Sequence, residues 1–184
     1  MQILYVCTGN QCRSVMAEYY TRAVLVKHGL SSRELDIRSA GTLRYPPHPA
    51  DPSAVAMLKA DGIDADSHRS TPLTTDASRE ANLILCFERE QIADLLEQNP
   101  LAGRKVFLFN DFVNACAHLR SDGPIPGDTI SDRLHEVMVS VSMLRPFLPK
   151  AEETEDPHLK SREVFEHVYA EIVKGVNVIL DAVA

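Results

Sequence analysis

The feature that most constrains this chain is the passage from an apolar run to a polar loop within residues 3–14. Ile3 to Val6 lead directly into Cys-Thr-Gly-Asn-Gln-Cys-Arg-Ser at residues 7–14, and a helical pattern follows. Gly9 and Asn10 favour a tight turn, so the pattern predicts a strand, a loop and a helix start in succession. Backbone N–H groups and the positive end of a helix dipole converge at such a helix start. The segment therefore predicts a binding site for an oxyanion.

A nucleophile and an anion clamp stand inside this predicted site. Cys7 lies where the strand ends, and a helix N-terminus favours the thiolate form of a cysteine, which is the nucleophilic form. Arg13 can hold two oxygens of a phosphate with its planar fork of donors, and Ser14 is placed to donate a hydrogen bond to the thiolate. A bare Cys-x5-Arg spacing would favour small buried cysteines and a solvated arginine. The strand, loop and helix around it favour the catalytic interpretation.

The loop resembles the active-site loop of the low-molecular-weight protein tyrosine phosphatases, whose pattern is Cys-x-Gly-Asn-x-Cys-Arg-Ser. All six fixed positions match. The resemblance implies that Cys7 is the nucleophile and Arg13 the phosphate clamp. It also implies that Asn10 shapes the loop, Ser14 is the partner of the thiolate and Cys12 is a second thiol that protects the first from oxidation. The other substrate-binding positions that it implies in the loop are Thr8, Gly9 and Gln11.

Size, charge and cysteine content bound the compartment and the partners. A chain of 184 residues fits one domain. Its net charge of −7 argues against nucleic acid or an anionic membrane surface as a partner, because both require clustered Lys and Arg. No apolar run approaches the roughly 20 residues of a membrane span, and no signal peptide is recognisable, so we expect a cytoplasmic protein. Four cysteines without framework spacing are typical of a reducing compartment. No metal-ligand spacing occurs either, and we expect neither a metal nor a cofactor.

Helical and strand patterns alternate along most of the chain. The near-continuous apolar run at residues 82–87 is typical of a central parallel strand that is covered on both faces. A strand that follows a helix implies a right-handed parallel unit. The predicted helices cover residues 14–28, 51–61, 88–97 and 162–183, and the predicted strands cover residues 3–6, 35–38, 82–87 and 105–109. We therefore predict an α/β fold, a three-layer α/β/α domain with a four-stranded parallel sheet and an active site at the carboxyl ends of its strands.

Two further segments are predicted to border the anion site. Residues 43–50 contain three prolines and form an extended loop. In the resembled family this loop carries an aromatic wall of the substrate cleft, for which Tyr45 and His48 are the candidates; the alternative is an ordinary solvated loop. The family also packs a histidine against its active-site loop. His68 is the candidate for that supporting role, against the alternative of a plain turn residue, and Ser39, where a strand ends, is a second supporting candidate.

The catalytic acid is predicted near the other end of the chain. Asp156 precedes Pro157, ahead of the last helical pattern. A carboxylic acid over the leaving oxygen can protonate it, and the same group can then deprotonate the water that hydrolyses a phosphocysteine. An Asp-Pro pair alone is an ordinary turn, but the resembled family keeps its acid in an Asp-Pro-aromatic motif ahead of its last helix. The resemblance therefore implies that Asp156 is the acid, and His158, in place of the usual tyrosine, is the adjacent substrate-binding candidate.

The segment between the fourth strand and the acid departs from the resembled family. Residues 112–119 predict a short helix, residues 122–128 a Gly/Pro loop and residues 131–148 a longer helix with an apolar stripe. Such a stripe is usually core, and the alternative is a partner surface or a lid. We predict a single phosphatase domain at residues 1–184 with a helical insertion at about residues 111–150.

These motifs predict a low-molecular-weight protein tyrosine phosphatase that acts through a phosphocysteine intermediate. Its expected substrates are phosphotyrosyl proteins, such as a bacterial tyrosine kinase, or small aryl phosphate monoesters. The first alternative is a thioredoxin-coupled arsenate reductase, whose loop also reads Cys-Thr-Gly-Asn-x-Cys-Arg-Ser. Those enzymes need two further cysteines close together after the third strand, where this chain has only Cys86. The second alternative is a non-catalytic phosphate-binding module, against which the joint presence of nucleophile, clamp and acid argues.

Overall fold

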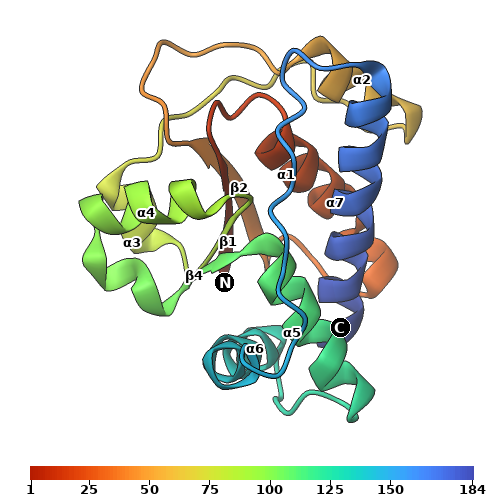
Figure 1. Ribbon diagram of the computed structural model, residues 1–184. Helices are drawn as coiled ribbons and strands as arrows, with labels where there is room; N and C mark the ends of the chain where they lie inside the picture. The colour runs from red at the N-terminus through yellow and green to blue at the C-terminus, as the bar shows by residue number, and fades with distance from the viewer.

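Four parallel strands carry the fold of the computed structural model, which describes residues 1–184 (Figure 1). The strands are β1 (Gln2–Cys7), β2 (Asp36–Gly41), β3 (Leu83–Cys86) and β4 (Val106–Leu108). Their order in the sheet is β2-β1-β3-β4, which confirms the predicted four-stranded parallel sheet. After β2 the chain crosses to the opposite side of β1, so the strand order reverses beside β1. Ligands of such sheets bind at the carboxyl ends of the strands at this point, and Cys7 ends β1 there.

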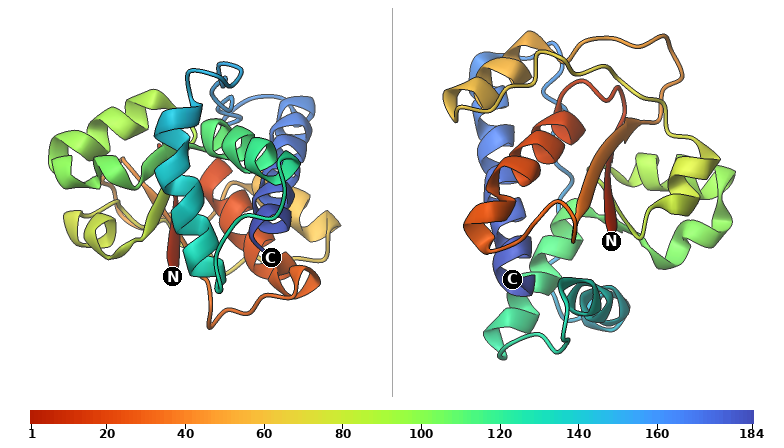
Figure 2. Two further views of the ribbon diagram at one scale, coloured as in Figure 1. Left: turned by 90° about the horizontal axis from the view of Figure 1, so that it is seen from below. Right: turned by 180° about the vertical axis from the view of Figure 1, so that it is seen from behind.

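The sheet is buried on both faces because helices cover each of them (Figure 2). Helices α1 (Arg13–Val24), α5 (Phe109–Ser121) and α7 (Arg162–Val183) lie on one side, with α2 (Pro52–Ala60) and α6 (Ile130–Leu144) packed against them. Helices α3 (Thr75–Glu80) and α4 (Arg89–Gln98) lie on the other side with the 3-10 helix η2 (Pro100–Arg104). This arrangement confirms the predicted three-layer architecture. None of these helices is long and apolar enough to cross a membrane.

Strand β1 divides its side chains between the two cores. Ile3, Tyr5 and Cys7 belong to the larger core beneath α1, α5 and α7. Leu4 and Val6 belong to the smaller core beneath α3 and α4. Successive side chains of a strand point to opposite faces, so an apolar run of five residues is required here, whereas a strand with one solvated face would alternate polar and apolar residues.

Local signals in the sequence set several helix boundaries. Asp51 caps α2, since its Oδ1 accepts the backbone N–H of Ser53 at 2.8 Å, and Pro52 occupies the first helical position. Helix α1 continues as the 3-10 helix η1 (Leu25–His28) and stops at Gly29, whose φ of 72° lies in the left-handed region. Thr129 and Asp132 form a reciprocal capping box at the start of α6.

The end of β4 and one short helix differ most clearly from the sequence-based expectation. The strand predicted to reach Phe109 ends at Leu108, and α5 begins at once. The Phe109 ring is turned into the larger core, where it lies 5.2 Å from the ring of Phe87. Helix α3 was not predicted, because its six residues are too few for a periodic pattern and only the capping bond from the Ala77 N–H to Thr74 Oγ1, 3.0 Å, marks its start.

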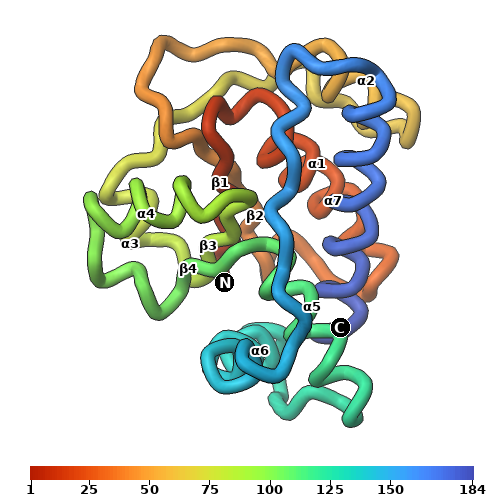
Figure 3. The backbone as a smooth tube through the Cα atoms, viewed as in Figure 1, coloured from red at the N-terminus to blue at the C-terminus, as the bar shows by residue number.

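The segment after α6 links the two ends of the molecule (Figure 3). Residues 145–161 contain no helix or strand. They run from the base of α6 along the outside of the sheet to the edge where β1 ends, and α7 then returns in the opposite direction. The helices predicted within residues 111–150 are present as α5 and α6. Their status as an insertion relative to the family stays a prediction.

Helix α7 packs closely against α5 at Gly175. A Cβ atom added at Gly175 would lie 2.5 Å from Cζ of Phe109 and 3.0 Å from Cγ2 of Val113. Phe109 is fully buried and packs beside the rings of Tyr5 and Phe87, so a shift of its ring would displace these neighbours. The absence of a side chain at Gly175 therefore sets the distance between these two helices.

We expect Gly175→Ala to lower the free energy of unfolding by about 1–2 kcal/mol. Overpacking of a buried contact costs about 1–3 kcal/mol, which exceeds the roughly 1 kcal/mol that alanine gains over glycine in a helix. Urea denaturation measures the change. The matched control is Gly103→Ala, where the nearest atom would lie at an ordinary 3.7 Å; a Gly175→Ala protein as stable as the wild type would contradict this account of the packing.

Candidate active site

Asn10 holds the loop of residues 7–14 in shape. Its φ of 49° lies in the left-handed region, which asparagine tolerates better than other residues with a side chain. Its Nδ2 donates hydrogen bonds to Oγ of Ser14 at 2.9 Å and of Ser39 at 2.7 Å, and its Oδ1 accepts the backbone N–H of Thr71 at 2.8 Å. Asn10 is 1% exposed. Its side chain therefore ties the loop to the strand and the loop behind it.

The same bonds orient Ser14 toward the candidate nucleophile. Oγ of Ser14 lies 3.0 Å from Sγ of Cys7, and both residues are buried. Because Oγ of Ser14 accepts from the amide of Asn10, its own proton is available for Cys7. The Ser14 hydroxyl is therefore positioned to donate a hydrogen bond to Sγ of Cys7.

His68 supports the loop from behind. Its Nε2 lies 2.9 Å from the backbone oxygen of Asn10, and since a carbonyl oxygen only accepts, the Nε2–H donates. Burial lowers the pKa of His68, which keeps the ring neutral. Ser39 continues the contacts outward, because its Oγ donates to Glu18, which pairs with Arg22 at 2.6 Å.

Arg13 is buried, and one edge of its guanidinium makes no hydrogen bond. It is 1% exposed, and Nη1 donates to the backbone oxygen of Thr154 at 2.9 Å. Nη2 lies 3.1 Å from a carboxylate oxygen of Glu88 and of Asp156. Neither carboxylate lies in the direction of an N–H bond, so Nε and Nη2 have no hydrogen-bond acceptor. Two adjacent unsatisfied donors match two oxygens of a tetrahedral anion, and buried donors without partners are rare.

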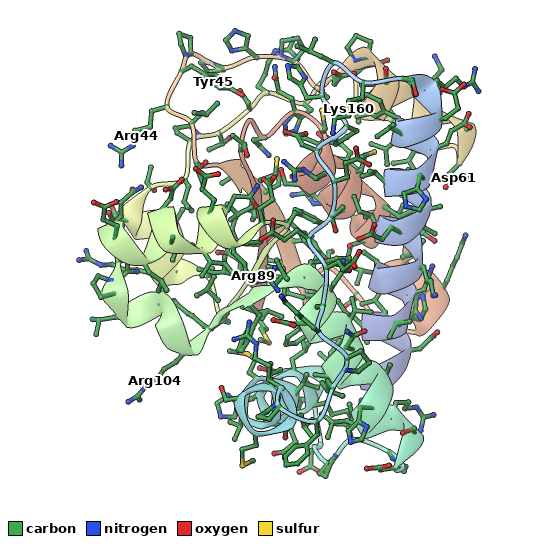
Figure 4. The ribbon with its side chains drawn as sticks, in the orientation of Figure 1. Arg44, Tyr45, Asp61, Arg89, Arg104 and Lys160 are labelled. Atoms are coloured by element: carbon green, nitrogen blue, oxygen red, sulfur yellow. The ribbon has the colours of Figure 1, made fainter.

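A cavity of about 200 Å³ opens over Cys7 and Arg13. Three stretches far apart in the sequence form it: the loop after β1, the proline-rich loop after β2 and the segment ahead of α7. The phenol of Tyr45 donates to the backbone oxygen of Gly9, and Figure 4 places Tyr45 and Lys160 on the two loops at this end of the molecule. The lining residues are Cys7, Thr8, Gly9, Gln11, Cys12, Arg13, Leu43, Tyr45, Asp156 and His158.

The structure thus brings nine of the predicted site residues to one cavity and places the other four behind its loop. The four behind the loop are Asn10, Ser14, Ser39 and His68. His48, the second candidate for an aromatic wall, packs against the ring of Tyr45 at 4.8 Å between ring centroids. It does not line the cavity.

Two residues beside Arg13 were missed by sequence reasoning. Glu88 follows the buried strand β3, and its Oε2 also accepts from the hydroxyl of Thr8 at 3.3 Å. An acidic residue directly after a central parallel strand was a usable signal, since such strand ends meet at one edge of the sheet. Thr154 acts through its backbone oxygen, so its side-chain type carried no signal.

Arg89 and Lys160 anchor the segment that carries Asp156. The backbone N–H of Arg89 donates to Glu153 at 2.9 Å, and its guanidinium donates to the backbone oxygen of Ala151 at 2.8 Å. The first of these bonds lowers the pKa of Glu153. Lys160 pairs with Glu155 at 2.8 Å. These contacts hold residues 151–160 over the loop.

A buried cysteine and arginine in an anion-binding loop, with a carboxyl group over them, define the class of cysteine-dependent phosphatases. The comparisons with known proteins agree with this class. The model of the family described as low molecular weight phosphotyrosine protein phosphatase matches residues 2–142. The chain therefore belongs to the low molecular weight phosphotyrosine protein phosphatase family.

Individual relatives and structures are similar over much of their length. A protein-arginine-phosphatase of Bacillus subtilis is 35% identical over 113 residues, which are 61% of this chain and 73% of that protein. Low molecular weight protein-tyrosine-phosphatase Etp of Escherichia coli is 28% identical over 167 residues, 91% of this chain and 84% of that one. The crystal structure of a low molecular weight protein tyrosine phosphatase from T. tengcongensis has a TM-score of 0.73 at 26% identity and covers 98% of both chains. These matches confirm the predicted enzyme class, a hydrolase of the protein-tyrosine-phosphatase type, and do not favour the arsenate reductase.

The lowered pKa of His68 predicts that the protein becomes less stable as the pH falls below about 6.5. In the unfolded chain His68 binds a proton near its ordinary pKa of 6.5, whereas the folded protein keeps it neutral. The unfolded state therefore binds more protons below about pH 6.5, and the free energy of unfolding falls there. His68→Gln cannot titrate, so the difference in stability between wild type and variant should shrink from about pH 8 to about pH 5.5.

Urea denaturation at both pH values measures that difference. His118→Gln, at an exposed position on α5, controls for the removal of a histidine as such. A difference that stays constant or widens as the pH falls would contradict the assignment of a neutral His68.

Arg89→Ala should slow catalysis because it loosens the segment that positions Asp156. The side chain of Arg89 is exposed, but it holds both Glu153 and Ala151. We expect kcat to fall by up to about tenfold, since small misplacements of a catalytic group are costly. Steady-state kinetics measure the effect against Arg104→Ala, an exposed arginine at the far end of η2 (Figure 4). Equal kcat values in the two variants would show that the anchor is dispensable.

Proposed function

We propose that this protein hydrolyses phosphotyrosyl proteins or aryl phosphate monoesters through a phosphocysteine formed on Cys7. The single observation that supports this proposal most strongly is that one edge of the buried Arg13 makes no hydrogen bond and lies in the wall of the same cavity as Cys7. Buried donors that make no hydrogen bond are costly unless an acceptor completes them. A dianionic phosphate monoester supplies that anion.

In the first step the phosphate binds to Nε and Nη2 of Arg13 and to the backbone N–H groups of the loop. The Cys7 thiolate, with the hydroxyl of Ser14 beside it, attacks phosphorus. A P–S bond forms, and the bond to the leaving oxygen breaks. Asp156, within 3.1 Å of Arg13, delivers its proton to that oxygen.

In the second step Asp156, now a carboxylate, takes a proton from a water molecule, whose oxygen attacks phosphorus. The P–S bond breaks, and orthophosphate leaves. Ser14 stabilises the departing thiolate as it stabilised the attacking one. The backbone N–H of His158 donates to Oδ1 of Asp156 at 3.2 Å, which holds the carboxyl group in one orientation for both proton transfers.

The walls of the cavity support an aromatic phosphate as substrate. Tyr45 and His158 stand on two different loops and both line it, so two aromatic side chains are available to contact a phenyl ring. We propose a phosphotyrosyl protein, such as a bacterial tyrosine kinase, as the partner, with small aryl phosphates as the second class. The named activity of the Escherichia coli relative supports the first. We place the reaction in the cytoplasm.

Phosphoarginine in proteins is a second candidate substrate. The Bacillus subtilis relative is named for that activity. The polar groups at the cavity favour this substrate. The amide of Gln11 and the carboxyl of Asp156 line the cavity, and Oδ2 of Asp51 lies 3.4 Å from Nδ1 of His158. Carboxylates around the entrance would pair with a guanidinium.

Hydrolysis of para-nitrophenyl phosphate tests the assigned roles. We expect vanadate-sensitive hydrolysis that is abolished in Cys7→Ser, which lacks a thiolate. Asp156→Ala should lower kcat by about 10²- to 10⁴-fold, the usual contribution of general acid–base catalysis. Asp128→Ala, an exposed aspartate remote from the cavity, is the matched control.

The wild type and Cys7→Ser also distinguish between the two proposed substrate classes. Peptides that carry phosphotyrosine or phosphoarginine are compared by kcat/KM in the wild type, and Cys7→Ser serves as a trap for phosphoproteins. Hydrolysis that survives in Cys7→Ser would overturn the phosphocysteine. Arsenate-dependent oxidation of thioredoxin without phosphate hydrolysis would instead favour the arsenate reductase.

A further inference from the structure

Cys12, Asp51 and His158 meet at the side of the catalytic cavity, although they come from three separate segments. Their ligand atoms all lie within 4.8 Å of one another. Nδ1 of His158 is 3.4 Å from Oδ2 of Asp51. Sulfur, carboxylate oxygen and imidazole nitrogen are the three protein ligands of Zn²⁺. Neighbouring donors in a tetrahedral zinc site are about 3.5 Å apart, given bonds of about 2.0–2.3 Å, so a shift of about 1 Å completes the set.

Two of these residues are fixed and one has room to move. Cys12 is 4% exposed at the start of α1. Asp51 has an exposed side-chain fraction of 14%, and its Oδ1 is engaged by the Ser53 N–H at the cap of α2. That bond leaves Oδ2 directed at the site and orients the ligand as the outer contacts of metal sites do. The His158 side chain is 48% exposed and lies on a coil segment, so its ring can close the set.

The charges around Cys12 favour a cation. Asp51 lies within the set, and Asp156 lines the same cavity as Cys12 and His158. Both carboxylates attract a dication, while Arg13 in that cavity acts in the opposite direction. A coordinated thiol is deprotonated by the ion itself.

We propose that Cys12, Asp51 and His158 bind one Zn²⁺ ion reversibly and that the bound ion inhibits the enzyme. Zn–S, Zn–O and Zn–N bonds form, the thiol proton passes to solvent, and no electron is transferred. Water takes the fourth position. Cys12 and His158 line the same cavity as Cys7, so the ion narrows the approach to the nucleophile. Inhibition rests on the proposed function, whereas binding does not.

Spacing in the sequence predicted no metal because the three ligands are remote from one another along the chain. They stand at positions 12, 51 and 158, and only the fold assembles them. The proposed ion is a reversible inhibitor and takes no part in the reaction of Cys7.

Binding is measured in the Cys7→Ser background, which removes the nucleophile as a competing ligand. Titration of Zn²⁺ against a chromophoric zinc chelator should give one ion per chain, and Co²⁺ should give the visible absorption of a thiolate complex. Adding His158→Phe, Cys12→Ser or Asp51→Asn should weaken Zn²⁺ binding at least about tenfold. Asp51→Asn keeps the helix cap, because asparagine is an equally good cap residue.

The matched control is His118→Phe. His118 is also a partly exposed histidine near a carboxylate, at 3.9 Å from Asp122, but it lies on α5, away from the cavity. This variant should bind Zn²⁺ as the parent does. Equal zinc affinity in the parent, the His118 variant and the His158 variant would overturn the proposed site. The measured Zn²⁺ would then be bound adventitiously at the surface.

Inhibition is measured with Cys7 present, and each protein is normalised to its own rate in chelator. The Zn²⁺ concentration for half-inhibition should rise at least about tenfold in His158→Phe and stay unchanged in His118→Phe. Unchanged inhibition in His158→Phe would overturn the proposal, because the ion would then act on Cys7 itself. Failure of phosphate hydrolysis in the wild type would refute the proposed function but leave the chelator titration as an independent test of the site.

Discussion

The buried guanidinium of Arg13 joins the parts of the molecule on which the site depends. Arg13 starts α1, donates a hydrogen bond to the backbone oxygen of Thr154 and faces the carboxylates of Glu88 and Asp156. The start of the first helix, the end of a central strand and the segment ahead of the last helix are thereby brought to one point. A charge in this position is expensive to bury. The fold satisfies it partly and leaves one edge of donors for the phosphate.

A second set of contacts, behind the loop, satisfies the buried polar side chains there with hydrogen bonds. Asn10 has partners for both ends of its amide and for its backbone oxygen, and through Ser14 it reaches Sγ of Cys7. The loop is thus rigid where it carries the nucleophile. It is unsatisfied only where a substrate oxygen belongs, which is the arrangement expected of a preorganised phosphate site.

The parts of the fold that the sequence predicts correctly are the ones determined by local patterns. Strand β1 and the run at residues 82–87 are apolar on both faces, and Gly29 and Asp51 mark helix ends by their own chemistry. The predicted strand end at Phe109 was wrong because Val106 to Phe109 all favour strands. In the structure Phe109 is the first residue of α5, and its ring packs in the core beside Phe87. Helix α3 is too short for periodicity to reveal.

The candidate site divides in the same way. Residues 7–14 are contiguous, so their motif is readable in the chain. Asp156 came from a resemblance, since an Asp-Pro pair by itself is a turn. Glu88 and the backbone oxygen of Thr154 could not be assigned, because their contacts with Arg13 span 75 and 141 positions and exist only after folding.

The most direct test of the account is a crystal structure of the protein with vanadate. The account predicts vanadium bonded to Sγ of Cys7, with two vanadate oxygens accepting from Nε and Nη2 of Arg13 and Asp156 beside the oxygen opposite the sulfur. Vanadate bound elsewhere, or an Arg13 edge that stays turned away from the bound anion, would contradict it.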